Sequence, residues 1–165
     1  MSTNARTTRV IIVEDKADEL GKAITAVKAA FGENVLINTA GTYVGFRRIS
    51  VPLFIERDGW KEYEDVFVLT DMMFPEKEGG KEEPNGLLVL ENCIFHGHFV
   101  AVCSDLCNGH NAAWLYPALK ALGKMHPLGS IPKETGSKNW SRCIEKLVQF
   151  RDHYLRSDAP APSQG

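Results

Sequence analysis

The sequence has no long hydrophobic run, no excess of basic residues and no apolar leader segment. No stretch approaches the ~20 consecutive apolar residues that a membrane-spanning helix needs. The polar opening MSTNARTTR lacks the apolar core of a signal peptide. Acidic residues outnumber basic ones by 21 to 19 and the net charge is −2, whereas general nucleic-acid binders carry a basic excess. We therefore expect a cytoplasmic protein that neither inserts into a membrane nor binds nucleic acid directly.

Cysteine is also scarce, with four residues in 165. In a cytoplasmic protein these are expected to be thiols rather than disulfides. Cys103, Cys107 and His110 lie close together in the sequence and could suggest zinc, but their spacing is not that of a zinc finger or ribbon. Cys103 follows an apolar run, so a core position is the simpler interpretation.

The overall composition is that of an ordinary globular protein. Hydrophobic residues make up 44% and charged residues 24%, which is typical of one folded domain of this length. We place that domain at residues 9–156 and expect flexible ends at 1–8 and 157–165. The C-terminal segment, SDAPAPSQG, has too few apolar residues to fold.

Short apolar runs alternate with helical patterns along the chain. The predicted strands are Val10–Val13, Val35–Ile37, Val66–Leu69, Phe99–Val102 and, more weakly, Leu128–Ile131. The predicted helices are Lys16–Phe31, Tyr43–Ile49, Gly86–Phe95, Tyr116–Leu122 and Ser137–Leu155. Strict alternation with strands that are apolar on both faces indicates an α/β fold, a parallel sheet covered by helices on both faces.

Polar residues follow the predicted strands. Glu14 and Asp15 follow the first, Asp71 the third, Ser104 the fourth and Lys133 the weak fifth. Because functional sites of such sheets lie at the carboxyl ends of the strands, we expect these side chains to meet at one edge. Clustered carboxylates repel one another unless a cation is present.

Mg²⁺ suits such a cluster because it prefers oxygen ligands. Asp15 and Asp71 could bind it directly, with Glu14 acting directly or through water. A carboxylate so neutralised can attack phosphorus and form an aspartyl phosphate. Lys133 could then pair with one phosphoryl oxygen and Ser104 could donate a hydrogen bond to another.

With these residues in this order, the sequence resembles the receiver domain of two-component response regulators. The motifs that carry the resemblance are V-I-I-V-E-D at 10–15, V-L-T-D-M-M-F-P at 68–75, N-G-L-L-V-L at 85–90, V-C-S at 102–104, and Lys133. The resemblance implies a flavodoxin-like sheet of five parallel strands in the order 2-1-3-4-5. It also implies that Asp71 is the phosphoacceptor, with Ser104 and Lys133 at the phosphoryl group.

The resemblance further implies a Mg²⁺ site made of Glu14, Asp15, Asp71 and the main-chain carbonyl of Met73. The phosphodonor would be a phosphohistidine on a histidine kinase or phosphotransfer protein. The chain would then be no enzyme in the usual sense, since it would catalyse only its own phosphorylation and dephosphorylation. With no effector domain in the sequence, its output would be a contact with an unknown downstream protein.

Several alternatives stay open on the sequence. Asp15 could be a helix N-cap and Asp71 a turn residue. A pseudo-receiver that binds partners without phosphorylation is favoured by Asp105, by Glu134 and by a fifth strand without an aromatic residue. A phosphatase of the haloacid dehalogenase type would need an aspartate at position 73, which is Met73.

Two segments look like insertions into this pattern. Leu53–Glu64 precedes the third predicted strand, and Glu76–Glu83 follows Pro75. The second reads EKEGGKEE, so it has little to bury, and we expect a solvated loop that overhangs the polar edge of the sheet.

Overall fold

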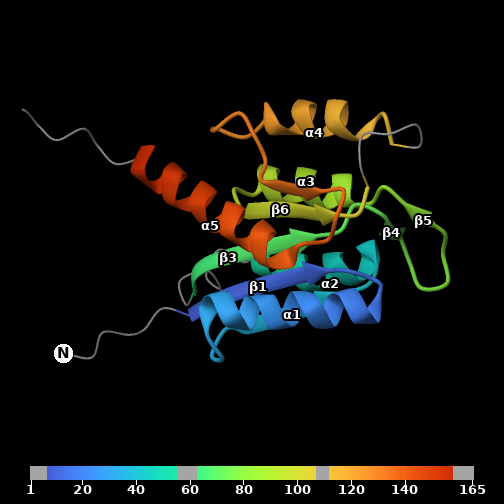
Figure 1. The fold of residues 1–165 in the computed structure, drawn as a ribbon, viewed down its shortest axis with the longest axis horizontal. Coiled ribbons are helices and arrows are strands. Elements are labelled where there is room, and N and C mark those ends of the chain that lie inside the picture. The colour runs from blue at the N-terminus through green and yellow to red at the C-terminus, as the bar shows by residue number, and fades with distance from the viewer. Residues whose placement is uncertain (1–6, 56–62, 107–111, 158–165) are drawn as a thin grey trace, which may run out of the picture.

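The computed structural model describes residues 7–55, 63–106 and 112–157. The strands are β1 (Thr7–Val13), β2 (Leu36–Ala40), β3 (Tyr63–Thr70), β4 (Phe74–Pro75), β5 (Glu82–Glu83), β6 (Phe99–Ser104) and β7 (Lys133–Thr135). The helices are α1 (Ala17–Phe31), α2 (Tyr43–Ile55), α3 (Gly86–Phe95), α4 (Leu115–Gly123) and α5 (Trp140–Ser157). Figure 1 shows these elements in place.

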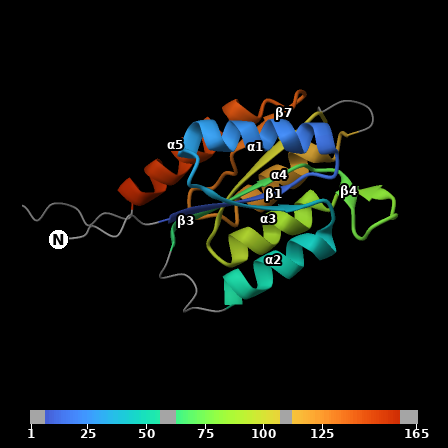
Figure 2. The same ribbon diagram turned by 90° about the horizontal axis from the view of Figure 1, so that it is seen from below.

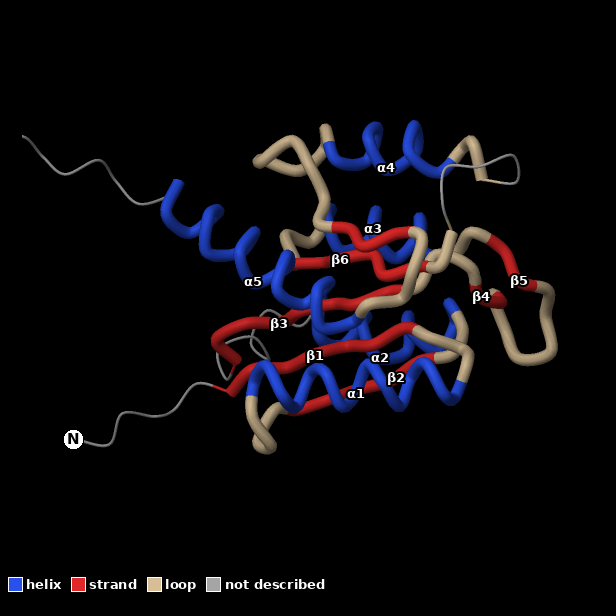
Figure 3. The backbone as a smooth tube through the Cα atoms, in the orientation of Figure 1, coloured by secondary structure: helices blue, strands red, loops and turns tan. Residues whose placement is uncertain are grey.

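Five of the strands form one parallel sheet in the order β2-β1-β3-β6-β7. Counted along the chain, this is the predicted order 2-1-3-4-5, so the flavodoxin-like fold class is confirmed. The strand order reverses between β1 and β3, and the carboxyl ends of both strands point to the same edge (Figure 3). That edge is where ligands bind in this topology.

Two apolar layers cover the sheet because successive strand residues face opposite sides. Val10 and Ile12 face α1 and α5, whereas Ile11 and Val13 face the side covered by α2, α3 and α4. Figure 2 shows α1 and α5 together on one side of the sheet. The four β1 residues are fully buried, which explains why the sequence reads as a continuous apolar run there.

The second predicted insertion is a small hairpin. β4 and β5 pair antiparallel, Phe74 with Glu83 and Pro75 with Glu82, and residues 76–83 are exposed as expected. The amide of Val44 at the start of α2 donates to the carbonyl of Glu76 at 2.9 Å, which fastens the hairpin to that helix. In the other predicted insertion, α2 runs to Ile55 and β3 begins at Tyr63, while residues 56–62 lie outside the described residues.

Three element predictions are wrong in an informative way. α2 does not end before Pro52 but continues through it to Ile55. Pro52 has no amide hydrogen to donate within the helix, but the added turn packs Leu53 on the core. The last strand is Lys133–Thr135 rather than Leu128–Ile131. It is an edge strand whose Glu134 is held by Lys146, so its residues need not be apolar.

The third difference concerns the start of α5. This helix begins at Trp140, not at Ser137, because the side-chain oxygen of Asn139 accepts the amide of Arg142 at 3.0 Å and so caps the first turn. Residues 136–139 are consequently a loop at the polar edge of the sheet.

The domain limits also differ slightly from the prediction. β1 already includes Thr7 and Thr8, and α5 reaches Ser157. Residues 1–6 and 158–165 lie outside the described residues. None of the helices in the described part of the chain combines the length and the apolar character needed to span a bilayer.

Candidate functional site

A cluster of three carboxylates, two of them buried, lies at the carboxyl edge of the sheet. Glu14 and Asp15 follow β1 and Asp71 follows β3, and each offers a carboxylate oxygen within 4.8 Å of the others. Main-chain hydrogen bonds fix their positions: the amide of Asp71 donates to the carbonyl of Val13, and the amide of Glu14 to that of Ala40, both at 2.9 Å. The sheet itself thus brings the three residues together, as the sequence predicted.

The cation in this cluster is Lys138. Its ammonium nitrogen donates to Glu14 Oε2 at 2.5 Å and to Asp71 Oδ2 at 2.7 Å. The three side chains are almost fully buried, with exposed fractions of 5% for Lys138, 0% for Glu14 and 2% for Asp71. Such a pair of charge-assisted hydrogen bonds is among the stronger contacts available to a protein.

The prediction that Lys133 supplies this cation is wrong. Lys133 is exposed and its ammonium nitrogen lies over the ring of Tyr116, 5.9 Å from the ring centroid. It lies in β7 beside Val102, two residues before the level of Ser104 at the end of β6, whereas Lys138 lies in the loop that follows β7. The sequence signal that could have found Lys138 is Asn139, a favoured N-cap residue directly before Trp140.

The remaining predicted site residues lie at the same edge. Ser104 ends β6, is buried, and accepts the amide of Leu106 on its hydroxyl oxygen at 3.4 Å. Met73 lies two residues after Asp71, and its side chain packs on the core. The Asp71 carboxylate also accepts the amide of Met72 at 2.6 Å. The role of the Met73 carbonyl as a metal ligand stays a prediction.

The structure also places two residues on which the pseudo-receiver and zinc interpretations depended. Asp105 is exposed, so its carboxylate faces water beyond the end of β6. Cys103 is a buried core residue with a free thiol, while Cys107 and His110 lie outside the described residues.

The residues of the cluster fit a divalent cation. Three carboxylates and one ammonium leave two excess negative charges. Asp15 Oδ1 is buried and has no hydrogen-bond partner, which is costly for a carboxylate oxygen unless a ligand satisfies it. Oxygen donors of this kind and number suit Mg²⁺, and Asp15 is the residue whose oxygens are left for it.

Burial also shapes the titration of the cluster. Desolvation raises the pKa of Glu14 from 4.5 to about 6, against the opposing hydrogen bond from Lys138. For Lys138, burial acts to lower the pKa, but the hydrogen bonds to Asp71 and Glu14 outweigh it and the pKa is raised. Lys138 is therefore charged at neutral pH, and Glu14 is mostly ionised there.

A pH dependence of cation binding follows from Glu14. Because a carboxyl must lose its proton to bind a metal, we expect the affinity for Mn²⁺ to be about tenfold weaker at pH 5 than at pH 7.5. Because the pKa of Glu14 is higher in the folded protein than in the unfolded chain, the folded protein binds this proton more tightly. The contribution of Glu14 to the free energy of unfolding therefore falls as pH rises from about 4.5 to 6. Mn²⁺ titration followed by electron paramagnetic resonance measures the affinity.

The control for this prediction is Glu14→Gln, which keeps the size of the side chain but cannot titrate. It should bind Mn²⁺ more weakly than the wild type at pH 7.5 and lose most of the pH dependence. A wild-type affinity that is constant from pH 5 to 7.5 would contradict the assignment of Glu14 to the site.

Comparisons with known proteins find matches among solved structures. No protein-family model matches the sequence, and no curated protein matches it either. One matching structure is that of the RcsB response regulator of Salmonella typhimurium, from work on its conformational dynamism for DNA interaction. Its TM-score to this chain is 0.49 and the sequence identity is 12%. The match covers 96% of this chain and 64% of that chain. The flavodoxin-like fold follows from the strand order and register of the sheet.

Proposed function

We propose that the chain is a response-regulator receiver that accepts a phosphoryl group on Asp71 in the presence of Mg²⁺. The observation that carries the proposal is the Lys138 ammonium between the buried carboxylates of Glu14 and Asp71, with Asp15 beside them. The Lys138 ammonium would hold the carboxylate nucleophile, and the neighbouring oxygen ligands would hold Mg²⁺. Such an arrangement suits phosphoryl transfer.

The proposed step uses the residues of the edge as follows. The donor is a phosphohistidine on a histidine kinase or phosphotransfer protein. A carboxylate oxygen of Asp71 forms the new P–O bond, and the P–N bond breaks with its electron pair going to the imidazole nitrogen. Mg²⁺ held by Glu14, Asp15, Asp71 and the Met73 carbonyl would neutralise charge on the phosphoryl oxygens.

Two residues of the chain would stabilise the added charge. Lys138 already contacts Asp71 Oδ2 and needs only a small movement to pair with a phosphoryl oxygen. Ser104 carries a hydroxyl at the end of the neighbouring strand β6, where its proton can be donated to another oxygen. The output would be a changed surface that an unknown downstream protein recognises.

One observation favours a second candidate, a pseudo-receiver that acts without phosphorylation. Asp71 is only 1% exposed, so a donor can reach it only after a local movement of the residues that cover it, among them Lys138. β7, Lys133–Thr135, also provides no aromatic residue beside the site.

Intact-mass analysis after incubation with acetyl phosphate and Mg²⁺ separates the two candidates. We expect the wild type to gain one phosphoryl group and Asp71→Asn to gain none. Asp105→Asn is the matched control, because it makes the same chemical change at an exposed carboxylate of the same edge, and it should still be labelled. No mass gain in the folded wild type would support the pseudo-receiver instead.

A further inference from the structure

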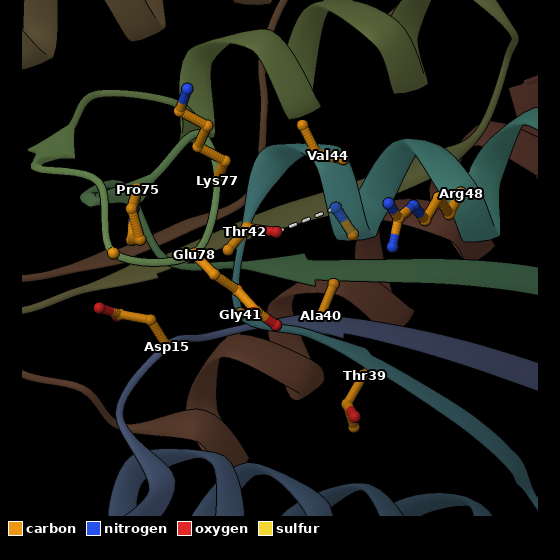
Figure 4. A pocket seen from close by; sticks show the side chains of 12 residues that line it. Asp15, Thr39, Ala40, Gly41, Thr42, Val44, Arg48, Pro75, Lys77 and Glu78 are labelled. Atoms are coloured by element: carbon orange, nitrogen blue, oxygen red, sulfur yellow. Dashed lines mark hydrogen bonds between the residues drawn. The ribbon is translucent and has the colours of Figure 1, made fainter.

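A cavity of about 770 Å³ lies between α2 and the β4–β5 hairpin, beside the carboxylate cluster (Figure 4). Its walls are the end of β2, the first two turns of α2 and the hairpin turn. Gly45 and Arg48 lie three residues apart on the face of α2 that borders the cavity, and Thr42, directly before the helix, continues that face. The volume is in the range of small-molecule sites in proteins.

The space exists because the residues beneath it are small. Ala40, Gly41, Gly45 and Gly79 all line the cavity and leave room that larger side chains would fill. The hairpin wall is held in place by the hydrogen bond from the Val44 amide to the Glu76 carbonyl at 2.9 Å. The cavity is thus bounded by two elements that are fastened to each other.

Hydrogen-bonding groups without protein partners line this space. Among the described residues, none forms an ion pair or hydrogen bond with the guanidinium of Arg48 or the carboxylate of Glu78. At the end near the carboxylate cluster, Asp15 Oδ1 is buried without a hydrogen-bond donor. In Figure 4, Arg48 and Asp15 lie at opposite ends of the cavity with Glu78 between them.

The positive charge that could bind an anion in this cavity is that of Arg48, not that of the N-terminus of α2. The first amides of that helix already have acceptors, since Val44 donates to Glu76 and Gly45 donates to the Thr42 hydroxyl at 3.0 Å. Helical side chains lean toward the N-terminus of their helix, so Arg48 leans back over the cavity. Its planar guanidinium suits a bidentate contact with a phosphate or carboxylate.

We propose that this cavity binds a small hydroxylated organic anion. Its phosphate or carboxylate group pairs with Arg48, and its hydroxyl groups donate to the carboxylates of Glu78 and Asp15. The Asp15 carboxylate belongs both to the lining of the cavity and to the carboxylate cluster, so the ligand hydroxyl and a divalent cation would compete for it. This binding is separate from phosphorylation at Asp71, although both involve the same edge of the sheet.

The test is an amide chemical-shift titration of the full chain carrying Asp71→Asn, without divalent cations. The probes are glycerol 3-phosphate, glycerate and glycerol, which offer a phosphate, a carboxylate and no anion respectively. We expect saturable shifts at Thr42–Arg48 and at 77–79 with at least one of the two anions. Which anion binds more tightly distinguishes a phosphate ester from a carboxylic acid as the natural ligand.

Arg48→Met should weaken binding of that anion at least tenfold, because the substitution keeps much of the stem but removes the guanidinium. Arg47→Met is the matched control, since Arg47 is the neighbouring arginine of α2 and does not line the cavity; it should leave the affinity unchanged. Equal affinity in Arg48→Met, equal binding of glycerol, shifts elsewhere, or no saturable binding by either anion would overturn the proposal. Because the protein tested cannot be phosphorylated at Asp71, these outcomes are independent of the proposed function.

Discussion

Lys138→Met should lower the free energy of unfolding by about 3 kcal/mol in metal-free buffer at neutral pH, because removing one partner of a buried ion pair leaves uncompensated charge. The substitution removes the ammonium that contacts both Glu14 and Asp71 and keeps a side chain of similar length. The two carboxylates then face each other, and Asp15, without a counter-ion. Urea denaturation followed by circular dichroism measures the change.

Lys133→Met is the matched control, because it makes the same substitution at the lysine that was predicted from the sequence to lie at the phosphoryl group. Lys133 is exposed and its ammonium lies over the face of the Tyr116 ring, so its loss should cost less than about 1 kcal/mol. Equal losses in the two variants, or a gain of stability in Lys138→Met, would contradict the assignment of Lys138 as the counter-ion of the cluster.

Mg²⁺ should then distinguish a counter-ion from a residue that merely packs. In Lys138→Met a divalent cation can take over the neutralisation of Glu14 and Asp71, so millimolar Mg²⁺ should recover much of the lost stability through binding to the folded state. The affinity for Mg²⁺ should also be higher than in the wild type, since the ammonium and the metal draw on the same carboxylate oxygens. An unchanged affinity would mean that Lys138 and the metal do not share ligands.

The carboxylates could be predicted from sequence because the sheet places them. Val10–Val13 and Val66–Leu69 are apolar on both faces, which identifies them as inner parallel strands, and Glu14, Asp15 and Asp71 follow these strands directly. Once the strands are parallel neighbours, no other information is needed to bring their ends together.

Lys138 could not be placed in the same way because it depends on a loop. The edge strand β7 is polar, since Glu134 is paired with Lys146 from α5, so hydrophobicity pointed instead to Leu128–Ile131. That error moved the end of the strand upstream and made Lys133 the first lysine after it. The continuous helical pattern from Ser137 also hid the loop, whose limit is set by the single cap at Asn139.

Gly86→Ala should destabilise the protein by about 1–3 kcal/mol or more, because an added methyl group has no room. A Cβ atom at this position would lie 2.5 Å from the carbonyl oxygen of Asp71 and 2.7 Å from the Cα of Met72. Both are main-chain atoms and cannot move aside as a flexible side chain could. Either the start of α3 or the turn after β3 must shift, and the hydrogen bond from the Gly86 amide to the Met72 carbonyl, 3.0 Å in the wild type, must lengthen.

Gly21→Ala provides the opposite result from the same substitution. Gly21 lies within α1, and a Cβ atom there would meet nothing within 4 Å. Alanine should therefore stabilise that helix by about 0.5–1 kcal/mol through its better helix propensity. Urea denaturation of the two variants checks the signs, and a loss of similar size in both would contradict the argument from close approach.

The functional consequence of Gly86→Ala separates a packing defect from a defect at the site. The carbonyl that the methyl group would strike belongs to Asp71, so the proposed phosphoacceptor itself should be displaced. We expect labelling by acetyl phosphate to slow by at least tenfold in Gly86→Ala at a temperature where the variant is fully folded, and to be unchanged in Gly21→Ala. A folded Gly86→Ala protein that is labelled at the wild-type rate would show that α3 can yield without moving Asp71, and that the glycine serves packing alone.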